Sequence, residues 1–428
     1  MSTLNAITQS YHCLNSIYRE GAYSNIALND TLNQSSDEDK PLISKIVYGV
    51  LENDIFLNYI IKQFVPSAKP ALSVLLKIGT YMITHLSIPS AVVVNDCVNH
   101  AKKIGKGAVA NFVNATLRSV VRAKEANSFV FPAEPLKKAS VMYSYPYWAL
   151  MLLSREYGEE KAIAIASYRS DNATHVRINK SVTTNEKFEK TLQQKGLKYK
   201  KSILPDAYKI YGNVSALTKK GECVIMGLSS MLAALSVNVT DNADVLDLCA
   251  APGGKSVYMA QLNPTAKILS CDTYPHKLRL IEKYAAKMGV TNITTELNDA
   301  MEINPAYFGK FDFVLLDVPC SGFGVCYSKP EIKLFKKLDD VRNLVAVQQK
   351  MLFAAKNYVK VGGYLTYSTC TVFAEENRKN IKNFLAQNPE FALTDLNLPI
   401  KTETKDLQIL PHIFDAEGFY IARMVKTK

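Results

Sequence analysis

The sequence predicts a multidomain protein with three parts: an all-α domain over residues 1–130, a small α+β module over residues 136–235, and an α/β Rossmann-like domain over residues 236–428. Three observations predict this organisation. At 428 residues the chain is longer than one compact core normally supports. Apolar residues recur at helical spacing as far as about residue 125. From Asp244 onward, strand-like runs alternate with helical runs, which is typical of a parallel sheet covered on both faces.

The N-terminal part is expected to be helical because its apolar side chains lie three or four positions apart, as in residues 42–51 and 72–78. Prolines at positions 66, 70 and 89 separate the helices. A later helix over residues 112–121 carries Arg118, with Arg122 just beyond it. Cations at a helix C-terminus suit the helix dipole, and here they could also contact phosphate groups.

The middle module is expected to follow a linker at residues 129–135 and one long helix over residues 143–167. Its predicted strands and helix are, in order, residues 174–178, 184–195 (the helix), 198–201 and 207–211. Residues 136–240 hold 16 Lys and Arg against 8 Asp and Glu, which is two thirds of the net charge of +12. This charge, interleaved with tyrosines, favours RNA as a partner. An ordinary lysine-rich surface would explain the charge alone equally well.

The last part is predicted to be α/β because short apolar runs alternate with helical segments. The predicted strands are residues 245–248, 267–271, 293–297, 311–316, 363–367 and 418–425. The predicted helices are residues 277–288 and 340–358, with one more directly after the glycine-rich turn at residues 250–255.

Several classes of protein are disfavoured. The first 20 residues hold no continuous apolar segment, and no apolar run is long enough to span a bilayer. The eight cysteines form no C-x-x-C pair and the six histidines are scattered, so we expect neither a metal site nor a disulfide framework. A monomeric protein of the reducing cytoplasm is the expectation.

The glycine-rich turn indicates a nucleotide-like cofactor. Its Gly-Lys-Ser at residues 254–256 resembles a P-loop, but Cys249 stands where that motif needs glycine, and the dinucleotide fingerprint G-x-G-x-x-G is absent. Asp272 ends the next predicted strand, where a carboxylate can receive ribose hydroxyls. An N-cap of the following helix would explain Asp272 alone equally well. Together the two features favour a nucleoside without a pyrophosphate, and S-adenosylmethionine fits best.

Two cysteines each follow a strand-like run: Cys320 in residues 311–320 and Cys370 in residues 363–370. A buried core cysteine is the ordinary explanation for either one alone. A pair beside a cofactor turn instead indicates covalent chemistry on an electron-poor ring.

Three motifs resemble those of the RNA cytosine-C5 methyltransferases of the Sun family. They are Asp-Leu-Cys-Ala-Ala-Pro-Gly-Gly-Lys at residues 247–255, Leu-Asp-Val-Pro-Cys-Ser-Gly at residues 316–322, and Tyr-Ser-Thr-Cys at residues 367–370 with Glu-Glu-Asn at residues 375–377. Residues 46–51 and 112–118 resemble a NusB-type RNA-binding domain, and the last strand is also similar to that of the family. The resemblance covers nearly the whole chain and is closest to the bacterial branch that acts on 16S rRNA. It implies a NusB-like fold for residues 1–130, S-adenosylmethionine as cofactor and 16S rRNA as substrate.

The chemistry of that family suits these residues. C5 of cytosine becomes nucleophilic only when a thiolate adds to C6, and a second group must later remove the C5 proton. The resemblance implies that Cys370 is the nucleophile and that Cys320 assists product release. DNA-type enzymes place the nucleophile in the Pro-Cys motif, so the reverse assignment stays open. Asp317 is expected at the N3/N4 edge of the base, and Lys255 near the target or the cofactor.

The residues expected to bind the cofactor are Cys249, Ala250, Ala251, Pro252, Gly253, Gly254, Lys255, Asp272, Asp299 and Asp317.

The chain departs from the family pattern in three places. Cys326-Tyr-Ser328 stands where two arginines are usual, Met226-Gly227 replaces Gln-Asp, and Tyr145-Pro146 replaces His-Pro. Loss of the arginines predicts weaker contacts with phosphate groups. The alternatives are a cytosine methyltransferase acting on tRNA or 23S rRNA, and a non-catalytic NusB-like RNA-binding factor. A Rossmann dehydrogenase is disfavoured because the dinucleotide fingerprint is missing.

Overall fold

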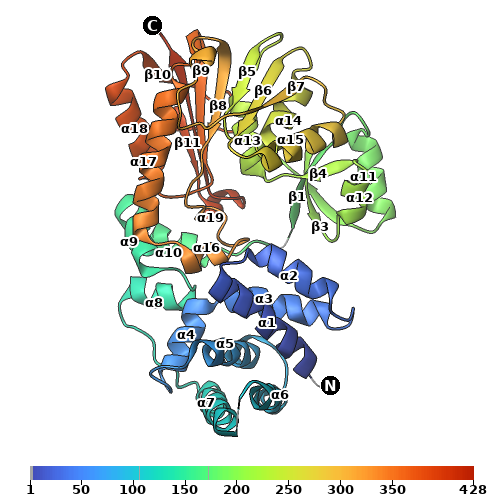
Figure 1. The fold of residues 1–428 in the computed structure, drawn as a ribbon, viewed down its shortest axis with the longest axis vertical. Helices are drawn as coiled ribbons and strands as arrows, with labels where there is room; N and C mark the ends of the chain where they lie inside the picture. The colour runs from blue at the N-terminus through green and yellow to red at the C-terminus, as the bar shows by residue number, and fades with distance from the viewer. Residues whose placement is uncertain (1–2, 106, 172) are drawn as a thin grey trace. The chain divides into compact units, whose positions relative to one another are not determined.

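The computed structural model describes residues 3–105, 107–171 and 173–428, which form two compact units (Figure 1). Unit 1 comprises the chain up to Ser167 together with Cys326–Lys336. Unit 2 comprises Tyr168–Val325 and Lys337–Lys428. The finer domain boundaries expected from the sequence stay predictions.

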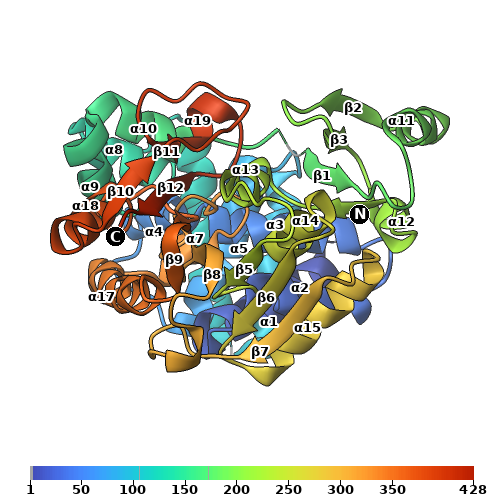
Figure 2. The same cartoon turned by 90° about the horizontal axis from the view of Figure 1, so that it is seen from above.

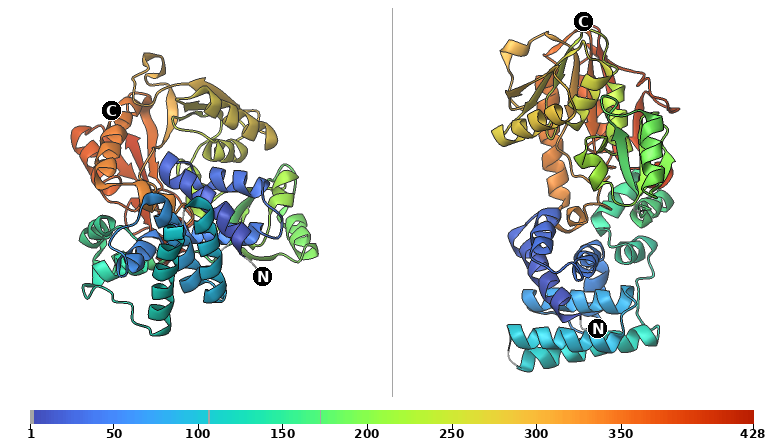
Figure 3. Two further views of the ribbon diagram at one scale, coloured as in Figure 1. Left: turned by 60° about the horizontal axis from the view of Figure 1, so that its bottom comes forward. Right: turned by 90° about the vertical axis from the view of Figure 1, so that its right-hand side faces the viewer.

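The secondary structure described for unit 1 is helical, as the spacing of its apolar residues predicts. Two of its helices, α6 (Ser90–Ile104) and α7 (Gly107–Glu125), lie side by side (Figure 3). One buried hydrophobic core joins its N-terminal helices. The helices of unit 1 are α1 (Leu4–Glu20), α2 (Ser24–Asn33), α3 (Lys40–Glu52), α4 (Asp54–Lys62), α5 (Pro70–His85), α6 (Ser90–Ile104), α7 (Gly107–Glu125), α8 (Pro135–Met142), α9 (Tyr147–Tyr157), α10 (Glu159–Ser167) and α16 (Glu331–Phe335).

The prediction of a single helix over residues 143–167 is wrong. Pro146 is the N-cap of α9, so this helix begins only at Tyr147. Gly158 then adopts a φ of 86°, a conformation that an L-residue in a helix cannot take, and it separates α9 from α10.

The segment Cys326–Lys336 belongs to unit 1, although it is far in sequence from the rest of that unit. Lys333 is buried, and its Nζ donates to the carbonyl oxygen of Glu52 at 3.0 Å. Leu334 packs against the N-terminal helical core. These contacts explain why a stretch lying between two parts of unit 2 groups with unit 1.

A small antiparallel sheet opens unit 2, with strand order β2-β3-β1-β4. Its first three strands lie where the sequence predicts them, and Thr184 caps α11 by accepting from Lys187 N at 3.4 Å. The fourth strand has only three residues and was not predicted. The elements are β1 (Thr174–Ile178), α11 (Asn185–Gln194), β2 (Lys198–Lys201), β3 (Ala207–Tyr211), α12 (Ser215–Lys219) and β4 (Cys223–Ile225).

The large sheet of unit 2 has the order β10-β12-β9-β8-β5-β6-β7, with β11 paired to β12. Strands β5 to β9 are parallel, whereas β12 runs antiparallel to β9, β10 and β11. The strands are β5 (Asp244–Asp247), β6 (Lys267–Asp272), β7 (Ile293–Leu297), β8 (Phe311–Asp317), β9 (Val359–Thr369), β10 (Phe391–Thr394), β11 (Asp406–Ile409) and β12 (Phe419–Lys426). The helical elements are α13 (Leu228–Ser236), α14 (Gly254–Leu262), α15 (Pro275–Lys287), η1 (Pro305–Tyr307), α17 (Leu338–Ala355), α18 (Arg378–Gln387) and α19 (Pro411–Phe414).

Helices cover both faces of this sheet, as Figures 1 and 2 show. Successive side chains of a strand point to opposite faces. On β8, Phe313 and Leu315 therefore pack in the cluster that includes α13 and α14, while Val314 and Leu316 pack in the cluster that includes α17 and α18. The chain builds β5, β6 and β7 in one direction and then returns to place β8 on the other side of β5. Such a reversal leaves a crevice at the carboxyl ends of the strands, where ligands bind.

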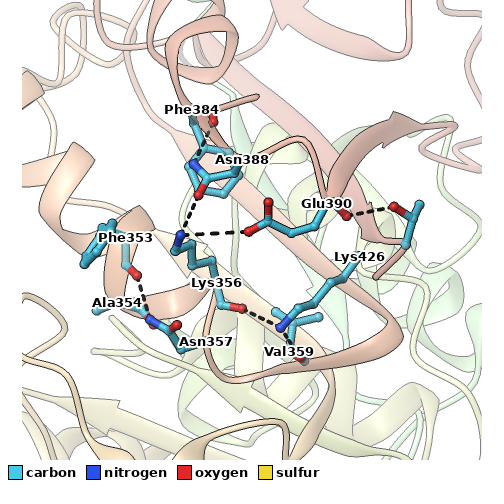
Figure 4. Close-up of polar contacts among 10 residues, drawn as sticks. Phe353, Ala354, Lys356, Asn357, Val359, Phe384, Asn388, Glu390 and Lys426 are labelled. Carbon is cyan, nitrogen blue, oxygen red and sulfur yellow. Dashed lines mark hydrogen bonds and ion pairs between the residues drawn. The ribbon is translucent and has the colours of Figure 1, made fainter. Parts of the chain in front are cut away.

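Lysines fix the region where β9 begins, far along the strand from its carboxyl end (Figure 4). Lys426 Nζ donates to the carbonyl oxygens of Lys356 and Val359 at 3.2 and 3.0 Å. Lys356 Nζ in turn donates to Asn388 Oδ1 at 2.6 Å and lies 3.8 Å from Glu390. These bonds tie the last strand to the end of α17 and to the turn before β10.

Within the parts of the chain that the structure describes, none of the helices combines the length and apolar character needed to cross a bilayer.

Candidate active site

The predicted site residues converge on one edge of the large sheet, because five parallel strands end there. The strand ends and the residues that follow them are Asp247 on β5, Asp272 on β6, Asp299 after β7, Asp317 on β8 and Cys370 directly after Thr369 of β9.

The two cysteines predicted to act together are in contact. Cys320 Sγ and Cys370 Sγ lie 3.2 Å apart, a distance suited to a thiol hydrogen bond and too long for a disulfide of about 2.05 Å. Their strands pair in parallel with Asp317 opposite Ser368. The loops that leave these two positions therefore start side by side at the same edge.

Asp317 and Lys255 form an ion pair beside the cysteines. Lys255 Nζ lies 2.5 Å from Asp317 Oδ2, and the Ser368 hydroxyl donates to Asp317 Oδ1 at 2.6 Å. Burial lowers the pKa of Lys255, but the charge of Asp317 and its hydrogen bond outweigh burial and raise that pKa overall. Lys255 is thus held as a cation next to a carboxylate that can accept hydrogen bonds from a ligand.

Two thiols of this region, those of Cys320 and Cys249, are held in the neutral form. The hydrogen bond with Cys370 raises the pKa of Cys320 well above its usual value, and burial raises it further. Burial also raises the pKa of Cys249 strongly, and the carboxylates around it act in the same direction. A cysteine with such a pKa is unreactive unless a neighbour stabilises its thiolate.

The glycine-rich turn is shaped to admit a ligand. Gly253 has a φ of 105° and leads into α14, and a Cβ built on Gly254 would meet no atom within 4 Å. The backbone N–H of Ala250 donates to the Cys271 carbonyl at 2.9 Å, which anchors the turn to the end of β6. The open backbone at the N-terminus of α14 fits a bound nucleoside and its polar tail.

Asp272 lies under this turn. Its Oδ2 accepts from Ala251 N at 3.3 Å, and its Oδ1 accepts from Thr273 N and pairs with Lys277 at 3.0 Å. The N-cap of α15 is Tyr274, so Asp272 does not cap that helix. A carboxylate offers about four acceptor sites, which leaves room for a ribose hydroxyl.

Asp299 lies on the loop after β7, and its Oδ1 accepts from the backbone N–H of Met301 at 2.9 Å. It is half-buried and shares the edge with Asp272, but its hydrogen bond is to its own turn.

Three polar residues of the edge were not among the predicted site residues. Asp247 is buried and accepts from the Ser256 hydroxyl at 2.6 Å, and burial raises its pKa to about 6. Ser368 orients Asp317, and Glu376 is buried beneath the cysteine loops. All three lie inside the motifs quoted from the sequence, so the motifs could have indicated them as site residues. Their hydrogen-bond partners lie elsewhere in the sequence, so their roles could not be assigned from the motifs alone.

Among the described residues, no group of three or more His, Cys, Asp and Glu is arranged to hold a metal ion.

Fold and site together define an α/β protein of the methyltransferase type with an appended all-helical unit. The family model described as 16S rRNA methyltransferase RsmB/F matches residues 234–425, and that of the NusB family matches residues 3–122. The chain is 34% identical to the probable ribosomal RNA small subunit methyltransferase B of Bacillus subtilis, over 95% of both chains. It is 26% identical to ribosomal RNA small subunit methyltransferase B of Citrobacter koseri, over 91% of this chain and 92% of that one. The chain therefore belongs to the family of S-adenosylmethionine-dependent ribosomal RNA small subunit methyltransferase B proteins.

Solved structures share the fold. The crystal structure of PH0851 superposes with a TM-score of 0.83 at 22% identity, covering 99% of this chain and 98% of the other. The crystal structure of NSun6 from Pyrococcus horikoshii, determined with the S-adenosylmethionine analogue SFG, gives a TM-score of 0.61 at 21% identity and covers 67% of this chain and all of the other.

A glycine contact near the cysteines generates a first prediction. Gly324 N donates to the Cys370 carbonyl at 3.0 Å, Gly418 N donates to the Gly324 carbonyl at 2.8 Å, and a Cβ on Gly324 would lie 1.9 Å from Gly418 O. Gly324→Ala must displace one backbone segment. We expect it to lower the free energy of unfolding by about 1–3 kcal/mol and methyl transfer by about 100-fold.

Thermal unfolding and transfer of labelled methyl groups to rRNA measure both effects. Gly107→Ala is the matched control, because its added Cβ would meet nothing within 4 Å. Equal results for the two variants would contradict the assigned role of the Gly324 contact.

Proposed function

We propose that this protein transfers a methyl group from S-adenosylmethionine to C5 of a specific cytosine in 16S rRNA, through a transient bond between Cys370 and C6 of the base. The observation that carries the proposal is the contact of two thiols, 3.2 Å apart, beside a paired aspartate and lysine at the cofactor edge of the sheet.

The proposed reaction uses two cysteine thiols that act on the same cytosine ring. The Cys370 thiolate adds to C6, and the electron density pushed to C5 lets that carbon accept a methyl group. A base then takes the proton from C5, the C6–S bond breaks, and the electron pair returns Cys370 to the thiolate. Cys320, in contact with Cys370, is the proposed helper in this release. Both sulfurs can reach one pyrimidine only because they are adjacent.

Asp317 is proposed to bind the amino edge of cytosine. Its carboxylate is paired with Lys255 and accepts from Ser368, so it acts as a hydrogen-bond acceptor. The N4 amino group of cytosine is a donor, and uracil has a carbonyl oxygen at the same position. Asp317 would therefore favour cytosine over uracil.

S-adenosylmethionine, when bound, supplies the electrophilic methyl group on a sulfonium. The residues proposed to hold it are the turn Cys249–Gly254 with Lys255, Asp272 for the ribose hydroxyls, Asp299 near the adenine, and Asp317 close to the methyl end. The open space at Gly254 and the remaining acceptor sites of Asp272 support this arrangement.

The RNA is proposed to contact the basic small sheet and the helices of unit 1, with the target base unstacked into the crevice. Residues 136–240 carry a net charge of +8, which suits a phosphate backbone. The relatives in Bacillus subtilis and Citrobacter koseri carry names that specify small-subunit rRNA, which favours 16S rRNA over tRNA or 23S rRNA.

The two cysteines give distinct expected phenotypes. Cys370→Ala should lower methyl transfer about 1000-fold or more, as loss of a nucleophile does in other enzymes. Cys320→Ala should instead accumulate an RNA adduct, because the C6–S bond forms but is released slowly. The adduct is measured as a shift that survives denaturing gel electrophoresis.

Cys13→Ala is the matched control, since Cys13 is a buried cysteine of unit 1. Wild-type transfer by Cys370→Ala would refute the nucleophile assignment. An adduct formed by Cys370→Ala instead would support the reverse assignment of the two cysteines.

The RNA target is tested in cells. Deletion of the gene should abolish 5-methylcytosine at one position of 16S rRNA, and a plasmid copy should restore it, as read by bisulfite sequencing of total RNA. Loss of a signal in tRNA or 23S rRNA with 16S rRNA unchanged would replace the proposed substrate. No change in any RNA would favour a non-catalytic RNA-binding protein.

Cofactor binding is tested separately. Asp272→Ala should weaken binding of S-adenosylmethionine about 10- to 100-fold, the loss expected for one or two hydrogen bonds to a charged group. Equilibrium dialysis with labelled S-adenosylmethionine measures the effect. The control is Asp37→Ala, whose side chain is 93% exposed in unit 1. Unchanged affinity in Asp272→Ala would remove Asp272 from the cofactor site.

A further inference from the structure

The two cysteine loops are held by two consecutive buried residues, Glu376 and Asn377. Both side chains have no exposed surface. They lie on the loop that leads into α18, which follows Cys370 by only a few residues.

Glu376 fixes the loop of Cys320 on both sides of the cysteine. Its Oε1 accepts from Ser321 N at 2.8 Å and from Gln348 Nε2 at 3.0 Å, and its Oε2 accepts from the Ser321 hydroxyl at 2.5 Å. Gln348 Nε2 also donates to the Pro319 carbonyl at 3.0 Å. The residues before and after Cys320 are therefore tied, directly or through Gln348, to one carboxylate.

The same carboxylate is connected to the loop of Cys370 by a chain of two hydrogen bonds. The Ser321 and Thr371 hydroxyl oxygens lie 2.8 Å apart. The single Ser321 hydroxyl proton goes to Glu376, so Thr371 is the donor to Ser321. Asn377 completes the link, because its Oδ1 accepts from the Thr369 hydroxyl at 2.5 Å and its Nδ2 donates to the Thr371 carbonyl at 3.0 Å.

Three donors converge on Glu376, namely Ser321 N, the Ser321 hydroxyl and Gln348 Nε2. Burial raises the pKa of Glu376, and these hydrogen bonds counteract burial by favouring the ionised form. The neighbouring phenol of Tyr367 is neutral, because burial raises its pKa well above the usual value. Glu376 thus places a carboxylate directly beside Ser321, the residue that follows Cys320.

A charged group lies near each cysteine: Glu376 is hydrogen-bonded to Ser321, next to Cys320, and Lys255 interacts with Cys370. Glu376 acts on Cys320 and disfavours its thiolate. The ammonium of Lys255 interacts with Cys370, and an attraction that favours the Lys255 cation equally favours a negative sulfur on Cys370. Since the sulfurs are 3.2 Å apart, only one of them can readily carry a charge.

We propose that Glu376 is a positioning residue that holds the loops of Cys320 and Cys370 at contact distance and, by its charge, directs the thiolate of the pair to Cys370. The role of that thiolate as a nucleophile toward RNA rests on the proposed function. Its location on Cys370 does not depend on the proposed function. It gives a physical basis for the assignment of Cys370 as nucleophile, which the motifs alone leave open.

The test compares the alkylation of the two cysteines in the full-length protein without RNA. Brief exposure to iodoacetamide between pH 6.5 and 9, followed by peptide mass spectrometry, yields the rate for each thiol. Wild type should react faster at Cys370. Glu376→Gln keeps the shape of the side chain but removes the charge, so the rate at Cys320 should rise about 3- to 10-fold, which corresponds to a change of half to one pKa unit.

Two further variants separate charge from geometry. Glu376→Asp keeps the charge and shortens the side chain, so the preference for Cys370 should remain. Ser321→Ala removes one hydrogen bond and leaves the charge, and it too should keep the preference. If Glu376→Gln matches wild type at every pH, or if Ser321→Ala changes the ratio as much as Glu376→Gln, the charge-directing role is overturned.

Thermal unfolding shows whether each variant is folded. If Glu376→Gln does not fold, the Asp and Ala variants still decide the outcome, because loss of the Cys370 preference in Glu376→Asp contradicts the proposal. Failure of this proposal can be distinguished from failure of the proposed function. If the wild type did not methylate rRNA, the alkylation rates of the two cysteines would be unaffected.

Discussion

The parallel pairing of β8 with β9 is the constraint on which the site depends. Asp317 lies opposite Ser368 in that pairing, and the cysteines follow on the loops that leave the two strands, Cys320 after Asp317 and Cys370 after Thr369. Parallel neighbours end at the same edge of a sheet, whereas antiparallel neighbours would send the two loops to opposite edges. The segment between Cys320 and Cys370, which are 50 positions apart, includes α17, which crosses one face of the sheet and makes the parallel return possible.

A network of buried hydrogen bonds then fixes the positions of the two cysteine loops. Loops at the end of a sheet lack ladder hydrogen bonds, so side chains must supply them. Here Glu376, Asn377 and Gln348 meet that need for the residues flanking both cysteines. Above them, Asp317 and Lys255 are fixed by Ser368 and by each other. The polar groups are satisfied by partners that also set the positions of the reactive groups.

The departures from the family pattern are explained by local packing. Cys326 is buried in unit 1 next to Tyr145, whose pKa is raised by burial and further by that thiol, so two of the three departures contact each other. At the third, a Cβ on Gly227 would lie 2.0 Å from Glu417 Oε1. The glycine therefore leaves the space that the Glu417 carboxylate occupies. An arginine at position 326 would have to bury its charge, which the cysteine avoids.

The sequence by itself determined the helical first part, the strands β1 to β3, the alternating pattern of the last part and the identity of the motifs, because these depend on the spacing of side chains and on local backbone preferences. It missed the break at Gly158 and did not predict β4, β10 or β11, because short edge strands and a glycine inside a helical pattern give weak local signals.

Only the tertiary structure decided that Cys320 contacts Cys370, that Lys255 pairs with Asp317, that Asp272 is not a helix cap, and that Glu376 links both cysteine loops. It also assigned residues 326–336 to unit 1. The physical reason is the same in each case. These contacts join residues that are far apart along the chain, and strand order and register, rather than local preference, bring them within hydrogen-bond distance.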